Sequence, residues 1–350
     1  MQTMTGETPA RPAEDQPPPA TPKTDQKTRR KLPEILFVHF KDLQAYHHEL
    51  MESHSPEAIH KMRVTTRRAQ AALDLLDGQI EIAPVKRRLR RWRRELSRVR
   101  NYDVFLILLE KEAKGVRAAN RQPFELVRAV LQQRRAETAD KVREYLLDKS
   151  ISRLAGRIGL SLPEDAEAPF ATESTLSIDE IQLASHTADR LDQRVAEFLA
   201  LAAQSHPATE AAELHELRIA AKRVRYLLEI ISEMGYGDAS RALAWLRTLQ
   251  DRIGDWHDLE SLEQEIIEII SERDFLKAHL LESSRMLQVA AHLQRKKERL
   301  VAKVFPVQVP QNLLATSQRL SKALRRSIPR KKHSIIESVS DSGATPLARE

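Results

Sequence analysis

A short pattern occurs twice in this chain, and this duplication constrains the fold more than any other feature of the sequence. The pattern places a histidine three residues before an arginine and seven residues before a second basic residue. The copies lie 155 residues apart, with His60, Arg63, Val64, Arg67 and Arg68 matched by His215, Arg218, Ile219, Lys222 and Arg223. A repeat of this size predicts two similar supersecondary units in one chain.

The composition indicates that both units are built from helices. The 350 residues include only 9 glycines and 5% aromatic residues, while 41% of the residues are hydrophobic. Sheets favour β-branched and aromatic residues, whereas leucine, alanine, arginine and glutamate, which dominate this chain, favour helix. We therefore expect an all-α fold.

Apolar spacing and capping signals place the individual helices. Ser55 before Pro56, for example, supplies a capping hydroxyl and a proline in the first helical turn, and Gly78 marks the end of that helix. The expected helices cover residues 32–51, 56–76, 84–110, 123–148, 178–203, 209–233, 239–270 and 275–304, with an interruption at Gly254 left open. Because the last four repeat the order of the first four, the sequence predicts two tandem, pseudo-symmetric four-helix bundles.

The domain boundaries follow from shifts in composition. The two predicted units span residues 32–155 and 177–305, and a segment with several glycines and prolines, 156–176, links them. The proline-rich residues 1–31 are expected to form a disordered leader. The basic residues 306–350 are expected to form a mobile tail.

The third helices of the two units also correspond, but at an offset of 157 residues. Leu89, Trp92, Leu96 and Val99 are matched by Leu246, Leu249, Ile253 and Trp256. The two additional residues fall in the predicted turn at Gly235 and Gly237. Loops accept insertions more easily than packed helices do, so the change in offset supports the repeat.

Positive charge is concentrated in the first unit. Residues 61–100 carry thirteen Lys or Arg and four Asp or Glu, whereas residues 241–270 carry three Arg and seven Asp or Glu. A concentrated positive field attracts polyanions and raises their rate of association. The partner is therefore expected to be an anion.

The motif places its basic residues on one helix face. At about 100° per residue, His215, Arg218, Lys222 and Arg225 share an arc of roughly 80°, and the large apolar residues lie opposite. The seven residues from the histidine to the last basic position span about 10 Å along the helix. Such a ladder suits a chain of phosphates, because the arginine fork matches phosphate oxygens.

The third helix of the first unit carries further arginines. Arg93 and Arg100 lie at the edge of its apolar seam and are secondary candidates for anion binding. We expect a solvated face for the remaining set, which comprises Arg87, Arg91, Arg94 and Arg98. Asp74 and Glu229 occupy equivalent positions and are expected to pair with Arg67 or Arg225 or to balance the charge of the helix surface. An arginine partner is also expected for Asp103.

Several functional classes find little support. The chain has no cysteine, which excludes thiolate metal sites and fits a reducing, cytoplasmic compartment. Neither an apolar leader nor a stretch of membrane-spanning length is visible. The adjacent His47 and His48 cannot share a helix face, so no metal site is predicted. In the absence of a phosphate-binding loop, a serine triad or paired carboxylates, we expect neither an enzyme nor a cofactor.

The duplicated motifs resemble those of the CHAD family, the conserved histidine α-helical domain. The resemblance rests on residues 60–68 and 214–226, extends to the segments LSRVRNYDV (96–104) and IGDWHDL (253–259), and covers roughly residues 32–305. It implies two similar four-helix bundles, binding of inorganic polyphosphate in a basic channel or groove, and association with polyphosphate granules. The binding residues that it implies are His60, Arg63, Arg67, Arg68, His215, Arg218, Lys222, Arg223 and Arg225.

The chain also departs from its own repeat and from the family pattern. Gln70 occupies the position that matches Arg225, so the first basic stripe is one charge short. Asn101 and Ser97 replace the aspartate and glycine usual in the family. The E-x-E-x-K strand of an attached triphosphate-hydrolysing domain, which many relatives carry, is not found. The resemblance therefore implies a stand-alone binding module.

Two alternative functions stay open beside polyphosphate binding. The net charge of +7 and the isoelectric point near 9.5 also suit a nucleic-acid binder, for example of RNA, but no aromatic residues interleave with the stripes to stack bases. The least favoured alternative is an enzyme that processes phosphate chains with His60 or His215 as general acid. The sequence leaves open whether the two halves form one channel or two grooves.

Overall fold

The computed structural model describes residues 29–53, 55–162, 175–206, 211–304 and 307–328, and all of its regular elements are helices. No strand occurs within these ranges, which confirms the all-α prediction. The helices are α1 (Leu32–Ser53), α2 (Pro56–Asp74), α3 (Ala83–Lys114), the short 3-10 helix η1 (Ala118–Asn120), α4 (Gln122–Leu147), α5 (Ile151–Gly156), α6 (Glu180–Gln204), α7 (Ala211–Glu233), α8 (Ser240–Ser271), α9 (Arg273–Ala278), α10 (Leu280–Val304) and α11 (Gln311–Arg326).

The predicted start signals act locally as expected. The Ser55 hydroxyl accepts a hydrogen bond from the Ala58 amide at 3.0 Å, and Pro56 lies in the first turn of α2. Asp179 caps α6 in the same way, because its carboxylate accepts from the amides of Ile181 and Gln182. These caps satisfy amide groups that have no partner within the helix. They fix where the helices that carry or flank the motif begin.

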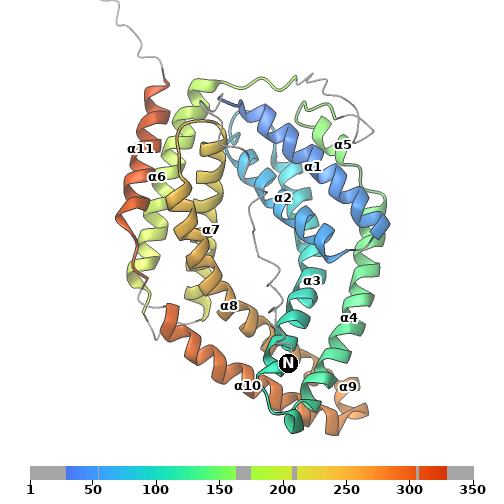
Figure 1. Ribbon diagram of the computed structural model, residues 1–350. Helices are drawn as coiled ribbons and strands as arrows, with labels where there is room; N and C mark the ends of the chain where they lie inside the picture. Colours follow the sequence, from blue (N-terminus) through green and yellow to red (C-terminus); the bar gives the residue numbers. More distant parts are fainter. Residues whose placement is uncertain (1–28, 54, 163–174, 207–210, 305–306, 329–350) are drawn as a thin grey trace, which may run out of the picture.

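Two segments differ from the expected pattern. The helix α8 continues through Gly254, which is buried, so this glycine does not interrupt it. The single helix expected over 275–304 is instead divided into α9 and α10 by His279, whose φ of −134° and ψ of 48° are not helical. The break changes the chain direction at one end of the molecule (Figure 1).

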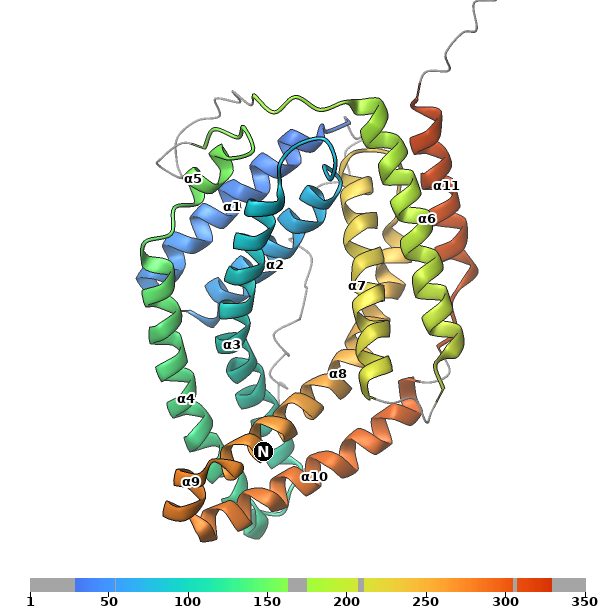
Figure 2. The ribbon, with the colours of Figure 1, turned by 180° about the vertical axis from the view of Figure 1, so that it is seen from behind.

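The apolar core crosses the boundary between the two predicted units. The larger buried cluster joins Leu36 and Trp92 of the first half to Phe198 and Leu228 of the second. A second cluster, at the end where α3 and α4 meet α8 and α10, also draws residues from both halves (Figure 2). The halves therefore share their cores, and two self-contained bundles are not confirmed.

The expectation of a mobile tail is wrong for residues 311–326. These residues form α11, which packs along α6 and also contacts α8 (Figures 1 and 2). Leu313, Leu320 and Leu324 are fully buried, and their spacing of seven and four residues places them on one helix face. The basic residues around them obscured this apolar stripe in the sequence. The rest of the expected tail, and the expected leader up to residue 28, lie outside the described residues.

The two-residue insertion between the motif helix and α8 lies beside α11. Gly237 has a φ of 148°, and a Cβ atom there would approach the Cδ2 atom of Leu320 to 3.0 Å. The glycine therefore leaves the space that the leucine fills.

Across the described residues, no helix combines the length and the apolar character that a bilayer crossing requires.

Candidate functional site

The two motif helices, α2 and α7, pack against each other and bring the two basic stripes together. They border two hollows. The wide hollow has a volume of about 580 Å³, and the narrow hollow has a volume of about 10 Å³. The basic residues of the wide hollow are Arg67, Lys86, Arg90, Arg93, Arg190, Arg194, His215, Arg218, Lys222 and Arg223. Those of the narrow hollow are His60, Arg63, Arg67, Lys222, Arg225 and Arg247.

Arg67 and Lys222 line both hollows, so the two basic stripes converge on one region. These residues are equivalent in the two copies of the motif. The Arg67 guanidinium also donates to the Tyr226 hydroxyl at 3.5 Å, which links α2 to α7. The two stripes therefore form adjoining parts of one basic region and do not point in unrelated directions.

The two hollows are built from equivalent positions. Each hollow is lined by the first half of one motif helix and by the second half of the other motif helix. The third part of its lining comes from the helix that follows this second motif helix in the chain. In the wide hollow these parts come from α7, α2 and α3, and in the narrow hollow from α2, α7 and α8. The pairs of equivalent positions are His215 and His60, Arg218 and Arg63, Lys222 and Arg67, Gln70 and Arg225, Arg90 and Arg247, and Arg93 and Gln250.

Most of the residues singled out from the sequence line a hollow, but Arg68 and Arg100 line neither. The charge of Arg68 instead acts on α1, where it contributes to the lowered pKa of His39, about 4, whose main cause is burial. The side chain of Arg100 is buried, with 4% of its surface exposed. Of the two secondary candidates, Arg93 therefore lines the wide hollow and Arg100 does not.

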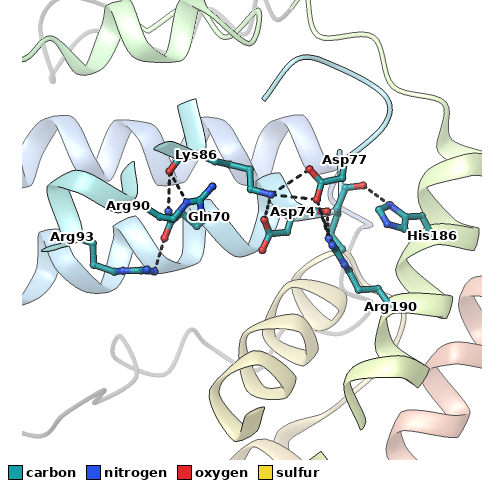
Figure 3. Close-up of polar contacts among 9 residues, drawn as sticks. Gln70, Asp74, Asp77, Lys86, Arg90, Arg93, His186 and Arg190 are labelled. Carbon is teal, nitrogen blue, oxygen red and sulfur yellow. Dashed lines mark hydrogen bonds and ion pairs between the residues drawn. The ribbon is translucent and has the colours of Figure 1, made fainter. Parts of the chain in front are cut away.

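Carboxylates neutralise one part of the wide hollow (Figure 3). The Lys86 ammonium lies 2.5 Å from a carboxylate oxygen of Asp74 and 3.2 Å from one of Asp77. Arg190 of α6 reaches the same Asp77 carboxylate at 3.4 Å and donates to the main-chain oxygen of Asp74. The positive field is therefore stronger toward Arg67, Arg93 and Lys222 than at this end.

Each of the three acidic residues singled out in the sequence has a basic partner in the structure. Glu229 lies 3.9 Å from Arg225, as predicted, and also 3.4 Å from Arg247. Asp103 pairs with Arg135 at 2.7 Å. Asp74 pairs with Lys86 of the third helix at 2.5 Å, a partner that was not predicted from the sequence. The arginines predicted to form a solvated face, Arg87, Arg91, Arg94 and Arg98, are exposed.

Three lining arginines were missed in the sequence. Arg90 lies on α3 three residues before Arg93, but the sequence did not distinguish it from the exposed arginines around it. Arg190 and Arg194 lie four residues apart on α6, which predicts one helix face for both. Their counterparts 155 residues earlier are Ile35 and His39, so a search guided by the repeat passes over them. Helical spacing of basic residues within α6 was the signal that could have found them.

Burial, together with the basic surroundings, lowers the pKa values of two cationic groups. Partial removal from water, followed by the charges of Arg218 and Lys222, lowers the pKa of His215 from its ordinary value. Burial and the nearby charge of Arg67 lower the pKa of Arg93. A bound anion would oppose both effects by stabilising the charged forms. The site is therefore arranged so that anion binding and protonation of His215 favour each other.

The part of the chain that the structure describes contains no group of three or more histidine or acidic side chains arranged to hold a metal ion.

Fold and site together define an all-helical protein whose duplicated histidine–arginine helices enclose a cation-lined hollow. A sequence profile of the CHAD domain matches residues 34–266. The chain therefore belongs to the CHAD domain family.

A solved structure of a CHAD domain has a similar fold. The crystal structure of the CHAD domain from the plant Ricinus communis is 24% identical, covers 80% of this chain and 92% of its own, and superposes with a TM-score of 0.57. PptA from Streptomyces chartreusis is 13% identical, with coverage of 83% and 97% and a TM-score of 0.48. No curated protein matches the chain.

Proposed function

We propose that this protein binds inorganic polyphosphate in the wide hollow and does not chemically alter it. The observation that carries the proposal is the convergence of the two motif copies at Arg67 and Lys222, inside a hollow with ten basic lining residues. A single small anion needs few of these charges. An extended chain of phosphates can contact cations from α2, α3, α6 and α7 at once.

The chemistry of the lining suits phosphate. Arginine presents a planar fork that can donate two hydrogen bonds to phosphate oxygens, and lysine supplies a mobile point charge. Each such charge-assisted hydrogen bond contributes about 1.5–3 kcal/mol net. The packing of α2 against α7 holds these groups in place before binding, which reduces the entropy lost on association.

The same features favour binding over catalysis. The lowered pKa of His215 favours the neutral imidazole in the unoccupied site, so this residue would have to take up a proton before it could act as a general acid. Asp74, the carboxylate that lines the wide hollow, is held by Lys86. We therefore propose a binding module in the cytoplasm that associates with polyphosphate granules.

The proposal is tested by titrating the protein with long-chain polyphosphate at several salt concentrations. Binding should be tight at low salt, and the logarithm of the affinity should fall linearly with the logarithm of salt concentration, as counterions are released from a polyanion. Single-stranded RNA of equal charge should bind more weakly, because the Tyr226 ring, which lines the wide hollow, is buried and already stacks with the Arg225 guanidinium. Equal affinity for RNA would favour a nucleic-acid function instead, and release of phosphate with added Mg²⁺ would indicate an enzyme.

Binding should also strengthen as the pH falls. The pKa of His215 is lowered in the unoccupied site, and a bound phosphate chain raises it, so protons are taken up on binding. The affinity should therefore rise as the pH falls from 8 toward 5.5, a range spanning roughly the histidine titration. Arg218, Lys222 and Glu216 act on this imidazole, and the ring of His257 lies 5.4 Å from it.

The control for this pH dependence is a pair of histidine substitutions. His215→Gln should flatten the rise in affinity, whereas His48→Gln should leave it unchanged, because His48 is exposed and pairs with Glu52 away from the site. The same pH slope in wild type and His215→Gln would show that this imidazole takes no charged part in binding.

A further inference from the structure

The equivalent positions of the two hollows differ by an exchange of arginine and glutamine. In the narrow hollow, the motif helix supplies Arg225 and the following helix supplies Gln250. In the wide hollow, the motif helix supplies Gln70 and the following helix supplies Arg93. The charge missing from the first stripe at position 70 is thus present in the same hollow, on the neighbouring helix.

Gln70 holds this arginine in place. It is buried, with 7% of its surface exposed, and its side-chain oxygen accepts a hydrogen bond from Arg93 Nη1 at 2.5 Å. Its amide nitrogen donates to the main-chain oxygen of Lys86 at 3.2 Å, which fixes the orientation of the amide (Figure 3). Both polar ends of the glutamine are therefore used, and the accepting end is aimed at the guanidinium.

The two exchanged arginines have different surroundings. Arg225 is almost fully buried, with 2% of its surface exposed. Its guanidinium lies 4.7 Å from the centroid of the Tyr226 ring and 3.9 Å from a carboxylate oxygen of Glu229. Arg93 instead lines the wide hollow and is held by a neutral amide, which does not cancel its charge. Arg225 is therefore held by other side chains of the protein, whereas Arg93 is placed to contact a ligand in the wide hollow.

We propose that Arg93 is a principal polyphosphate-binding residue, that Gln70 is its positioning residue, and that Arg225 is structural. This inference rests on the proposed function and deepens it, because it assigns the missing charge of the stripe to a residue on α3. The inference also reverses the expectation from the repeat. According to that expectation, Arg225 binds the ligand and the first stripe lacks one positive charge at position 70.

The test compares affinities for long-chain inorganic polyphosphate at fixed salt and pH. Arg93→Gln should weaken binding about tenfold or more, the effect of one lost charge-assisted contact. The matched control is Arg87→Gln, which removes the same charge from an exposed position on the same helix and should change the affinity less than about twofold. Arg225→Gln should lower the melting temperature but weaken binding less than about threefold.

The decisive variant exchanges the two side chains. Gln70→Arg combined with Arg93→Gln moves the positive charge from α3 to α2 within the wide hollow. The new guanidinium would not be held as Arg225 is, because Ala71 stands where the second copy has Tyr226, and Asp74, the counterpart of Glu229, already pairs with Lys86. The affinity should therefore recover to within about threefold of wild type. Recovery of affinity would show that binding depends on a positive charge in the hollow and not on the backbone position that carries it. A purely structural role for Arg93 does not predict such recovery. If Arg93→Gln is unfolded, Arg93→Lys replaces it, with an expected loss of about threefold because the fork is removed.

The outcomes separate this inference from the proposed function. If wild type does not bind polyphosphate, the proposed function fails. If wild type binds, but Arg93→Gln binds as tightly as Arg87→Gln, or the exchange variant binds no better than Arg93→Gln, the inference about Arg93 alone is overturned. Unchanged affinity of Arg93→Lys, where that variant is the one used, overturns it as well.

Discussion

Replacing both Arg67 and Lys222 with alanine should weaken polyphosphate binding by about a hundredfold or more at fixed salt. These two residues line both hollows, so the double substitution removes the cations at the point where the two copies of the motif meet. Two lost charge-assisted hydrogen bonds at about 1.5–3 kcal/mol each correspond to a loss of this size or larger. The measurement is a titration with long-chain polyphosphate under the conditions used for wild type.

A matched double variant controls for the change in net charge. Arg87→Ala combined with Arg91→Ala removes two positive charges from the exposed face of α3, and it should reduce the affinity only slightly, because exposed charges are screened by salt. If both double variants lose affinity equally, the ligand follows the overall charge of the protein and not the hollow. That result would remove the support for a specific site.

Leu320→Ala should destabilise the protein by about 2–5 kcal/mol, the usual cost of truncating a fully buried leucine. Leu320 is 0% exposed, on the apolar face of α11 and beside Gly237. The expected effect is a lower midpoint in urea unfolding. Polyphosphate binding by the folded variant should be unchanged, since Leu320 lines neither basic hollow.

An exposed leucine gives the comparison. Leu280 at the start of α10 is 67% exposed, so Leu280→Ala makes the same chemical change without opening a cavity, and its effect should stay within about 0.5 kcal/mol. If Leu320→Ala is as stable as Leu280→Ala, α11 does not contribute to the stability of the fold. Residues 311–326 would then behave as the mobile tail that the composition suggested.

The parts of the fold governed by local rules could be predicted from the sequence. Ser55 and Pro56 predicted the start of α2, and the spacing of leucines predicted the positions of the motif helices. The repeat identified the residues of the two basic stripes, but it left open whether these stripes form one channel or two grooves. What these predictions share is a signal contained within one helix or copied at a fixed offset.

The remainder depends on contacts between distant parts of the chain. Arg190 and Arg194 reach the wide hollow because α6 packs on α7, and no repeat marks them. Arg68 shares the motif but lies on the side of α2 that faces α1, as its effect on His39 indicates. The exchange of arginine and glutamine at Gln70 and Arg93 requires knowing that α2 and α3 contribute to one hollow. Sequence spacing alone did not contain that information.

The position of α11 bears on how much of the chain must be kept when a shorter piece is prepared. The region matched to the family ends at residue 266, before α10 and α11 begin. Both of these helices bury leucines against the rest of the protein, among them Leu293 and Leu324. A piece trimmed to the matched region would leave apolar surface uncovered and prone to aggregation. The smallest autonomous unit is therefore larger than the family boundary suggests and extends at least through residue 326.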